Sequence, residues 1–254
     1  MLSRRAFLAA LPLPLAGLAG RALARDSQDY AVVMGDSIAE GEPQRKGRLN
    51  VQGQFVPDYP SQPGQLSYEL AEFSGVFHFN HGMGGQTSTQ VRARWPRDVL
   101  AEDFDPGDGR GPRTLPAGTL PRLVYLHVGI NDVAYGATAA TLQDNFSYFA
   151  RTTAAHRIPL VIDNIGAWLG MTDAMIAQAG EVNRWLAQTL AARYANVAVV
   201  DYLHWSSGGT DNFRVMAPGL FVDGLHPTAQ GYIELARYAR ANLKLPAGSA
   251  VRYR

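Results

Sequence analysis

The chain has 254 residues, of which 46% are hydrophobic and 18% are charged, and this balance indicates a globular protein. It contains no cysteine, which excludes thiol catalysis, cysteine-based zinc sites and disulfide bonds. The formal net charge is +1. The densest basic group (Arg92, Arg94 and Arg97) is short and interrupted by Trp95 and Pro96, so we interpret it as a solvated helix face. Nucleic-acid binding, which needs a large basic surface, is therefore not expected.

The first 24 residues resemble an export signal. Residues 3–8 read SRRAFL, a short apolar stretch diluted by Gly and Pro follows, and residues 22–24 read ALA, a cleavage pattern. The paired arginines before Phe-Leu resemble a twin-arginine signal. The apolar stretch is too short to anchor the chain, so no stable membrane span is expected. We predict cleavage after Ala24, passage through the export translocon, a periplasmic or secreted location, and a single mature domain over residues 25–254.

From Tyr30 onward, short runs of β-branched and aromatic residues alternate with longer segments of helical periodicity. This alternation predicts a three-layer α/β/α sandwich around a parallel sheet of about five strands. No internal repeat or domain linker is evident. The strands are expected at 30–34, 76–80, 122–128, 160–165 and 197–201, the helices at 65–73, 86–100, 139–156, 172–194 and 228–243, and long loops at 41–63, 103–121 and 203–223.

Four short motifs carry candidate catalytic groups. Three of them follow the carboxyl ends of predicted strands, and the fourth precedes the last helix. Ligands bind at the carboxyl ends of strands in open parallel sheets, so we expect the motifs to form one site. They are GDS at residues 35–37, GMGG at 82–85, GIND at 129–132 and DGLH at 223–226.

These motifs contain the groups needed for acyl transfer through a serine. The Ser37 hydroxyl needs a base to remove its proton, and His226 is the candidate base. Asp223 can bind one ring nitrogen of His226 and leave the other to accept from Ser37. Pro227 is placed to start the final helix. Taken singly, Ser37 and Asp223 could equally be helix caps and His226 a surface residue.

Candidate oxyanion donors occur in the second and third motifs. The backbone N–H of Gly85, the side-chain amide of Asn131 and the backbone N–H of Ser37 could stabilise a developing oxyanion. Gly84 is the second choice in its motif. The alternative interpretations are a turn glycine and an Asx-turn asparagine.

No metal-binding motif such as H-E-x-x-H is present, and no phosphate-binding loop. Asp36, Asp132 and Asp163 could in principle gather around Mg²⁺, but a serine mechanism explains more residues. We therefore expect no catalytic metal and no cofactor. The other histidines are expected to be structural, with His127 in the core, His78 in the second strand, His81 in the glycine loop, and His156 and His204 at the periphery.

Together the motifs resemble the SGNH hydrolases, also called GDSL esterases and lipases, whose blocks carry Ser, Gly, Asn and His in this order. The resemblance extends over residues 30–243 and implies an SGNH/flavodoxin-like fold. It also implies that Ser37 is the nucleophile, His226 the base and Asp223 its orienting acid, with Gly85 and Asn131 in the oxyanion hole. Ile38 stands where the family's name motif has leucine. The long loop at 41–63 leaves substrate preference open.

Three functions are therefore considered. The first is an exported serine esterase that hydrolyses small-molecule or glycan esters through an acyl-enzyme. The second is an acetyl or acyl transferase, or a deacetylase, acting on cell-envelope or environmental glycans. The third is a non-catalytic binding module on the same fold. Aromatic residues in or beside predicted loops could stack on sugars in the second case; they are Tyr59, Trp95, Trp168 and Trp205.

Overall fold

The computed structural model describes residues 29–44, 47–49, 55–57, 61–245 and 251. The predicted signal peptide (residues 1–24), its cleavage site and Tyr59 lie outside the described residues.

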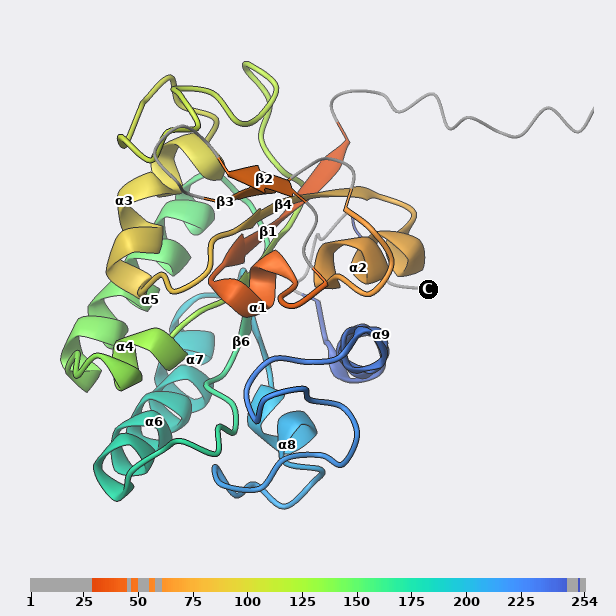
Figure 1. The fold of residues 1–254 in the computed structure, drawn as a ribbon. Coiled ribbons are helices and arrows are strands. Elements are labelled where there is room, and N and C mark those ends of the chain that lie inside the picture. Colours follow the sequence, from red (N-terminus) through yellow and green to blue (C-terminus); the bar gives the residue numbers. More distant parts are fainter. Residues whose placement is uncertain (1–28, 45–46, 50–54, 58–60, 246–250, 252–254) are drawn as a thin grey trace, which may run out of the picture.

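A five-stranded parallel sheet forms the centre of the molecule (Figure 1), in the order β4-β1-β5-β6-β7. Nearly all of its side chains are buried, as expected for parallel strands that are covered on both faces. The predicted α/β/α fold is therefore confirmed. The strands are β1 (Tyr30–Gly35), β4 (Phe77–Gly82), β5 (Val124–His127), β6 (Leu160–Asp163) and β7 (Val197–Val200).

Helices cover both faces of this sheet (Figure 1). Helices α3 (Ser88–Asp98), α5 (Ala139–Ala155) and α6 (Asp173–Trp185) lie on one side, and α2 (Leu66–Ser74) and α9 (Ala229–Asn242) on the other. Each face has its own hydrophobic core. In β1, for example, Val32 and Met34 belong to the first core and Ala31 and Val33 to the second, because side chains alternate along a strand.

Several shorter elements were not predicted. Three short helices follow strand ends: α1 (Ser37–Glu40), α4 (Ile130–Ala134) and α8 (Tyr202–Ser206). The predicted loop 41–63 contains an antiparallel pair, β2 (Gly47–Leu49) and β3 (Phe55–Pro57). The helix predicted at 172–194 continues from α6 into a π-helical turn, η1 (Leu186–Leu190), and ends in α7 (Ala191–Arg193). Within the described residues, no helix is long and apolar enough to cross a membrane.

Two local predictions were wrong. Pro227 does not occupy the first turn of α9, because Thr228 caps that helix by accepting a hydrogen bond from the Gly231 N–H. The basic group on α3 is not a solvated face. Arg94 and Arg97 are both buried, since α3 turns that side toward the sheet and the loop at 103–121 covers it.

Candidate active site

Three of the four motifs leave the sheet at the same level. Gly35 at the end of β1 pairs with Gly82 of β4 on one side and with His127 of β5 on the other. The chain segments that follow these three neighbouring strands therefore begin side by side, as the sequence predicted.

The turn after β1 places Ser37 at the start of a helix. Gly35 has φ +149°, and a Cβ there would lie 1.8 Å from the carbonyl oxygen of His127, so only glycine fits. Asp36 then caps α1, its Oδ1 accepting from the Ile38 N–H at 3.0 Å. Ser37 follows as the first helical residue, whose backbone N–H has no partner within a helix. Ser37 is only 6% exposed.

Ser37, His226 and Asp223 form one chain of hydrogen bonds. The Ser37 Oγ lies 2.9 Å from His226 Nε2, and His226 Nδ1 lies 2.7 Å from Asp223 Oδ2. Asp223 is itself oriented by the backbone, because its Oδ1 accepts from the N–H groups of Leu225 and His226. With His226 neutral, Nδ1 donates to Asp223 and Nε2 accepts the Ser37 proton, which is the arrangement of a catalytic triad.

The electrostatics of Asp223 agree with this role. Burial acts to raise the pKa of the Asp223 carboxyl, but hydrogen bonds from the ring and backbone of His226 outweigh it and lower the pKa. Asp223 is therefore ionised at neutral pH, and only an ionised carboxylate can stabilise an imidazolium through its charge.

The glycines of the second motif differ in what their N–H groups bind. The Gly84 N–H donates to Glu40 Oε2 at 2.7 Å. Gly85 is exposed, adopts φ +76°, and has no atom within 4 Å of where a Cβ would lie, so it borders open space. This difference favours Gly85 over Gly84 as the backbone donor to a substrate.

Asn131 lies at the start of α4 and points toward the same loop. Its Nδ2 donates to the backbone oxygen of Gln86 at 3.0 Å. An amide NH₂ carries two hydrogens, so this bond orients the group and leaves its second N–H for another acceptor.

Comparisons with known proteins bear on the family of this chain. The sequence profile of the GDSL-like lipase/acylhydrolase family matches residues 33–232. The chain belongs to this family. It is accordingly a hydrolase of the GDSL, or SGNH, type, as the motifs predicted. No curated protein matches this chain.

Several solved structures share the fold of this chain. A lipolytic protein of the G-D-S-L family from Desulfitobacterium hafniense is 20% identical, with 84% of this chain and 97% of that chain covered and a TM-score of 0.60. The acetyl xylan esterase AlAXEase is 17% identical, with 84% and 98% covered and a TM-score of 0.56. A mutant of Axe2, an acetyl-xylooligosaccharide esterase from Geobacillus, is 19% identical, with 83% and 91% covered and a TM-score of 0.55.

Two glutamates of this GDSL-type site were not predicted. Glu40 is buried on α1 and binds the Gly84 N–H, which connects the nucleophile helix to the second motif. Glu42 Oε2 lies 3.5 Å from His226 Nε2, on the side of the ring that faces Ser37. Their closeness to Ser37 in sequence was the available signal, but only the helical turn shows which way they point.

The aspartates considered for Mg²⁺ bind separate partners in the GDSL-type fold. Asp36 caps α1, Asp132 accepts from the backbone N–H and hydroxyl of Ser88, and Asp163 accepts from Tyr125 and faces His127. Within the part of the chain that the structure describes, no three His, Asp or Glu side chains are grouped to hold a metal ion.

The prediction for His127 as a hydrogen-bonded core residue is confirmed. Its Nδ1 lies 2.8 Å from Asp163 Oδ2. Burial acts to lower the pKa of His127, but the hydrogen bond to Asp163 and the charge of Asp36 outweigh it and raise the pKa. His81 was placed in the glycine loop, which is wrong, because it belongs to β4 and is fully buried.

The aromatic residues considered for sugar stacking are mostly part of the core. Trp95 lies within α3, fully buried, and packs against Phe149 with ring centroids 4.4 Å apart. Trp205 lies on α8 and packs against Tyr202 and Phe221. Trp95 and Trp205 therefore pack in the protein interior and are not placed to stack on a sugar. Trp168 is partly buried against the first core.

Proposed function

We propose that this chain is an exported serine esterase that hydrolyses carboxylic esters through an acyl-enzyme on Ser37. The observation that carries the proposal is the continuous hydrogen-bond chain from Ser37 Oγ through the ring of His226 to Asp223, with distances of 2.9 and 2.7 Å.

Each group has a defined task in this mechanism. The Ser37 Oγ attacks the ester carbonyl carbon while His226 Nε2 takes the hydroxyl proton, and Asp223 stabilises the resulting imidazolium. The imidazolium then protonates the departing alcohol as the acyl–serine ester forms. Water attacks this ester with His226 again as base, and the carboxylic acid leaves as Ser37 regains its proton.

The negative oxygen of each tetrahedral intermediate needs donors on the opposite side. We assign this role to the backbone N–H groups of Ser37 and Gly85 and to the free N–H of Asn131. The open space at Gly85 and the orientation of Asn131 by Gln86 support the assignment.

The decisive experiment measures turnover of short p-nitrophenyl esters by the wild type, Ser37→Ala and His226→Ala. Loss of either group should lower kcat by several orders of magnitude, and Asp223→Asn should lose less than Ser37→Ala. His204→Ala is a matched control, because His204 also pairs with an aspartate, Asp211 at 2.9 Å, but its ring stacks on Tyr238 of α9. Wild-type rates in Ser37→Ala would end the proposal.

A fluorophosphonate probe separates the esterase from a binding module. The probe labels only an activated serine, so labelling of the wild type and not of Ser37→Ala supports the esterase. Absence of labelling together with absence of turnover would favour the binding module.

A second candidate, a glycan acetyl esterase or transferase, is favoured by two of the similar structures. One is described as an acetyl xylan esterase and the other as an acetyl-xylooligosaccharide esterase. The same acyl-enzyme would form, and the acceptor would be water or a sugar hydroxyl. Product analysis on acetylated oligosaccharides, with and without added sugar acceptor, distinguishes hydrolysis from transfer.

Export is part of the proposal and rests on residues 1–24. The SRRAFL sequence supports the twin-arginine route, and ALA at 22–24 supports cleavage after Ala24. The mass of the mature protein recovered from the periplasm or medium tests both points. Retention of the variant Arg4→Lys, Arg5→Lys in the cytoplasm would support the route, and unchanged export of this variant would contradict it.

A further inference from the structure

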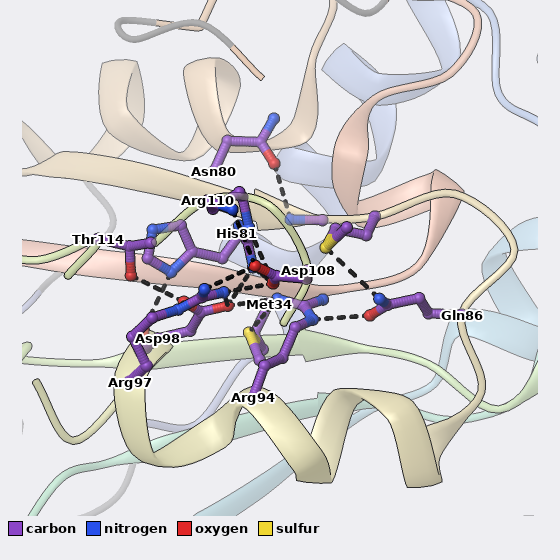
Figure 2. Close-up of polar contacts among 12 residues, drawn as sticks. Met34, Asn80, His81, Gln86, Arg94, Arg97, Asp98, Asp108, Arg110 and Thr114 are labelled. Atoms are coloured by element: carbon purple, nitrogen blue, oxygen red, sulfur yellow. Dashed lines mark hydrogen bonds and ion pairs between the residues drawn. The ribbon is translucent and has the colours of Figure 1, made fainter. Parts of the chain in front are cut away.

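A cluster of charged side chains lies buried next to the site, between α3 and the loop at 103–121 (Figure 2). Its centre is Asp98, which is fully buried and accepts from three arginines. The arginine–Asp98 distances are 2.8 Å for Arg94, 2.7 Å for Arg97 and 2.5 Å for Arg110. We call Arg94, Arg97, Asp98, Asp108 and Arg110 the arginine cluster.

Arg94 extends from this cluster to two loops of the active site. Its Nη2 donates to the backbone oxygen of Gly35 at 2.8 Å, and its Nε donates to Gln86 Oε1 at 2.6 Å. Figure 2 shows the link to Gln86 on one side of the guanidinium and the link to Asp98 on the other. Arg97 instead binds Asp98, Asp108 and the backbone oxygen of Gly111.

Gly35 and Gln86, which both accept hydrogen bonds from Arg94, lie close to the three proposed oxyanion donors. Gly35 precedes Asp36 and Ser37, so its carbonyl belongs to the turn that sets the Ser37 N–H. Gln86 directly follows Gly85, and its backbone oxygen orients the amide of Asn131. One guanidinium therefore connects the turn before Ser37 with the loop of Gly85, and through Gln86 it is linked to Asn131.

Burial of the charged Arg94 side chain costs free energy, so space filling alone does not explain why an arginine occupies this position. Its side chain is 2% exposed, and burial lowers its pKa to about 10, so it remains charged at neutral pH. An apolar side chain of similar volume would fill this space without desolvating a charge. What such a residue could not supply is a planar fork that donates in fixed directions to several acceptors.

We propose that Arg94 is a positioning residue, which holds the turn at Gly35 and the loop at Gln86 at a fixed separation so that the three oxyanion donors converge. The inference rests on the proposed function of those donors. Arg94 itself does not touch the substrate, and its effect reaches the reaction through Gly85 and Asn131.

The first test compares Arg94→Met and Arg94→Lys with Arg97→Met as a matched control. Both Arg94 variants should lower kcat by about 10- to 100-fold and change KM by less than about threefold, because misplaced donors weaken transition-state binding rather than substrate binding. Lysine keeps the charge beside Asp98 but cannot donate to Gly35 and Gln86 at once. Arg97→Met removes a buried guanidinium from the same cluster and should leave kcat unchanged in the folded protein.

Gln86→Met provides a variant that leaves the arginine cluster intact. It removes the acceptor of Arg94 Nε and keeps the backbone oxygen that Asn131 uses, so kcat should fall by about 3- to 10-fold. Combined with Arg94→Lys, it should add little further loss, since both changes break the same link.

Hydrogen exchange of backbone amides gives a readout that does not need turnover. Exchange in residues 83–87 should be faster in Arg94→Lys than in the wild type and unchanged in Arg97→Met. Wild-type kcat in folded Arg94→Lys, or an equal loss of kcat in Arg97→Met, would overturn the inference. If the wild type shows no Ser37-dependent turnover, the proposed function fails, and hydrogen exchange alone then tests the positioning role of Arg94. Unchanged exchange in Arg94→Lys would overturn the inference in that case.

Discussion

Replacing Asn131 with alanine tests the oxyanion hole most directly. The amide donates one hydrogen to the Gln86 backbone oxygen at 3.0 Å and has a second for the substrate. Removing one preorganised donor of this kind raises the barrier by about 2.7–4 kcal/mol, which is about 10²–10³ in kcat. KM should change little, because the carbonyl oxygen of the bound substrate is uncharged and becomes negative only as the tetrahedral intermediate forms.

The assay is steady-state turnover of p-nitrophenyl acetate by Asn131→Ala, with Ser37→Ala as the blank. Asn164→Ala is the matched control, since Asn164 follows the end of β6 and binds Asp201 and the Leu203 N–H but none of the proposed donors. Circular dichroism and a melting curve establish that the variants are folded. A kcat within about threefold of the wild type in folded Asn131→Ala would refute the reasoning.

Three further predictions concern folding. Gly35→Ala should prevent folding or abolish activity, because the added Cβ would lie 1.8 Å from a β5 carbonyl oxygen; a soluble variant with wild-type turnover would contradict this. Asp132→Ala should lower the free energy of unfolding in urea by about 3 kcal/mol, since Ser88 loses a carboxylate partner for both its N–H and its hydroxyl, and a change within error would count against it. Burial lowers the pKa values of His78 and His81 to about 4. Below pH 6.5 the unfolded chain therefore binds more protons at these histidines than the folded chain does. Each histidine should lower the free energy of unfolding by about 2 kcal/mol at pH 5. Urea unfolding at pH 7 and pH 5 measures the loss, and His78→Phe should remove about half of it.

The sheet was predictable because its signal is local. Each of the five strands is a short run of residues such as Val32 and Val161 that are buried on both faces, and each run is bounded by glycine, proline or polar residues. The order of the motifs then placed Ser37 and Asn131 at the strand ends that the structure brings together. The structure also joins Ser37, His226 and Asp223, which come from the first and last motifs, in one chain of hydrogen bonds.

The environment of the helices was not predictable in the same way. Arg94 and Trp95 look like parts of a solvated or loop-flanking segment, yet both are buried, because what covers them is the loop at 103–121 and the distant helix α5. The same holds for the π-helical turn at Leu186–Leu190, since i→i+5 hydrogen bonding has no distinct residue pattern.

The sequence by itself determined the chemical groups of this GDSL-type hydrolase and the strand ends that carry them, because strand periodicity and motif order are properties of neighbouring residues. Only the tertiary structure decided which of these groups form hydrogen bonds within the protein and which border open space. It shows that Glu40 occupies the Gly84 N–H and leaves Gly85 open, and that Arg94 joins two loops of the site. Two of these contacts join residues far apart in the chain, since Gly84 and Glu40 are 44 positions apart and Arg94 and Gly35 are 59 positions apart. Contacts at such separations produce no local sequence pattern.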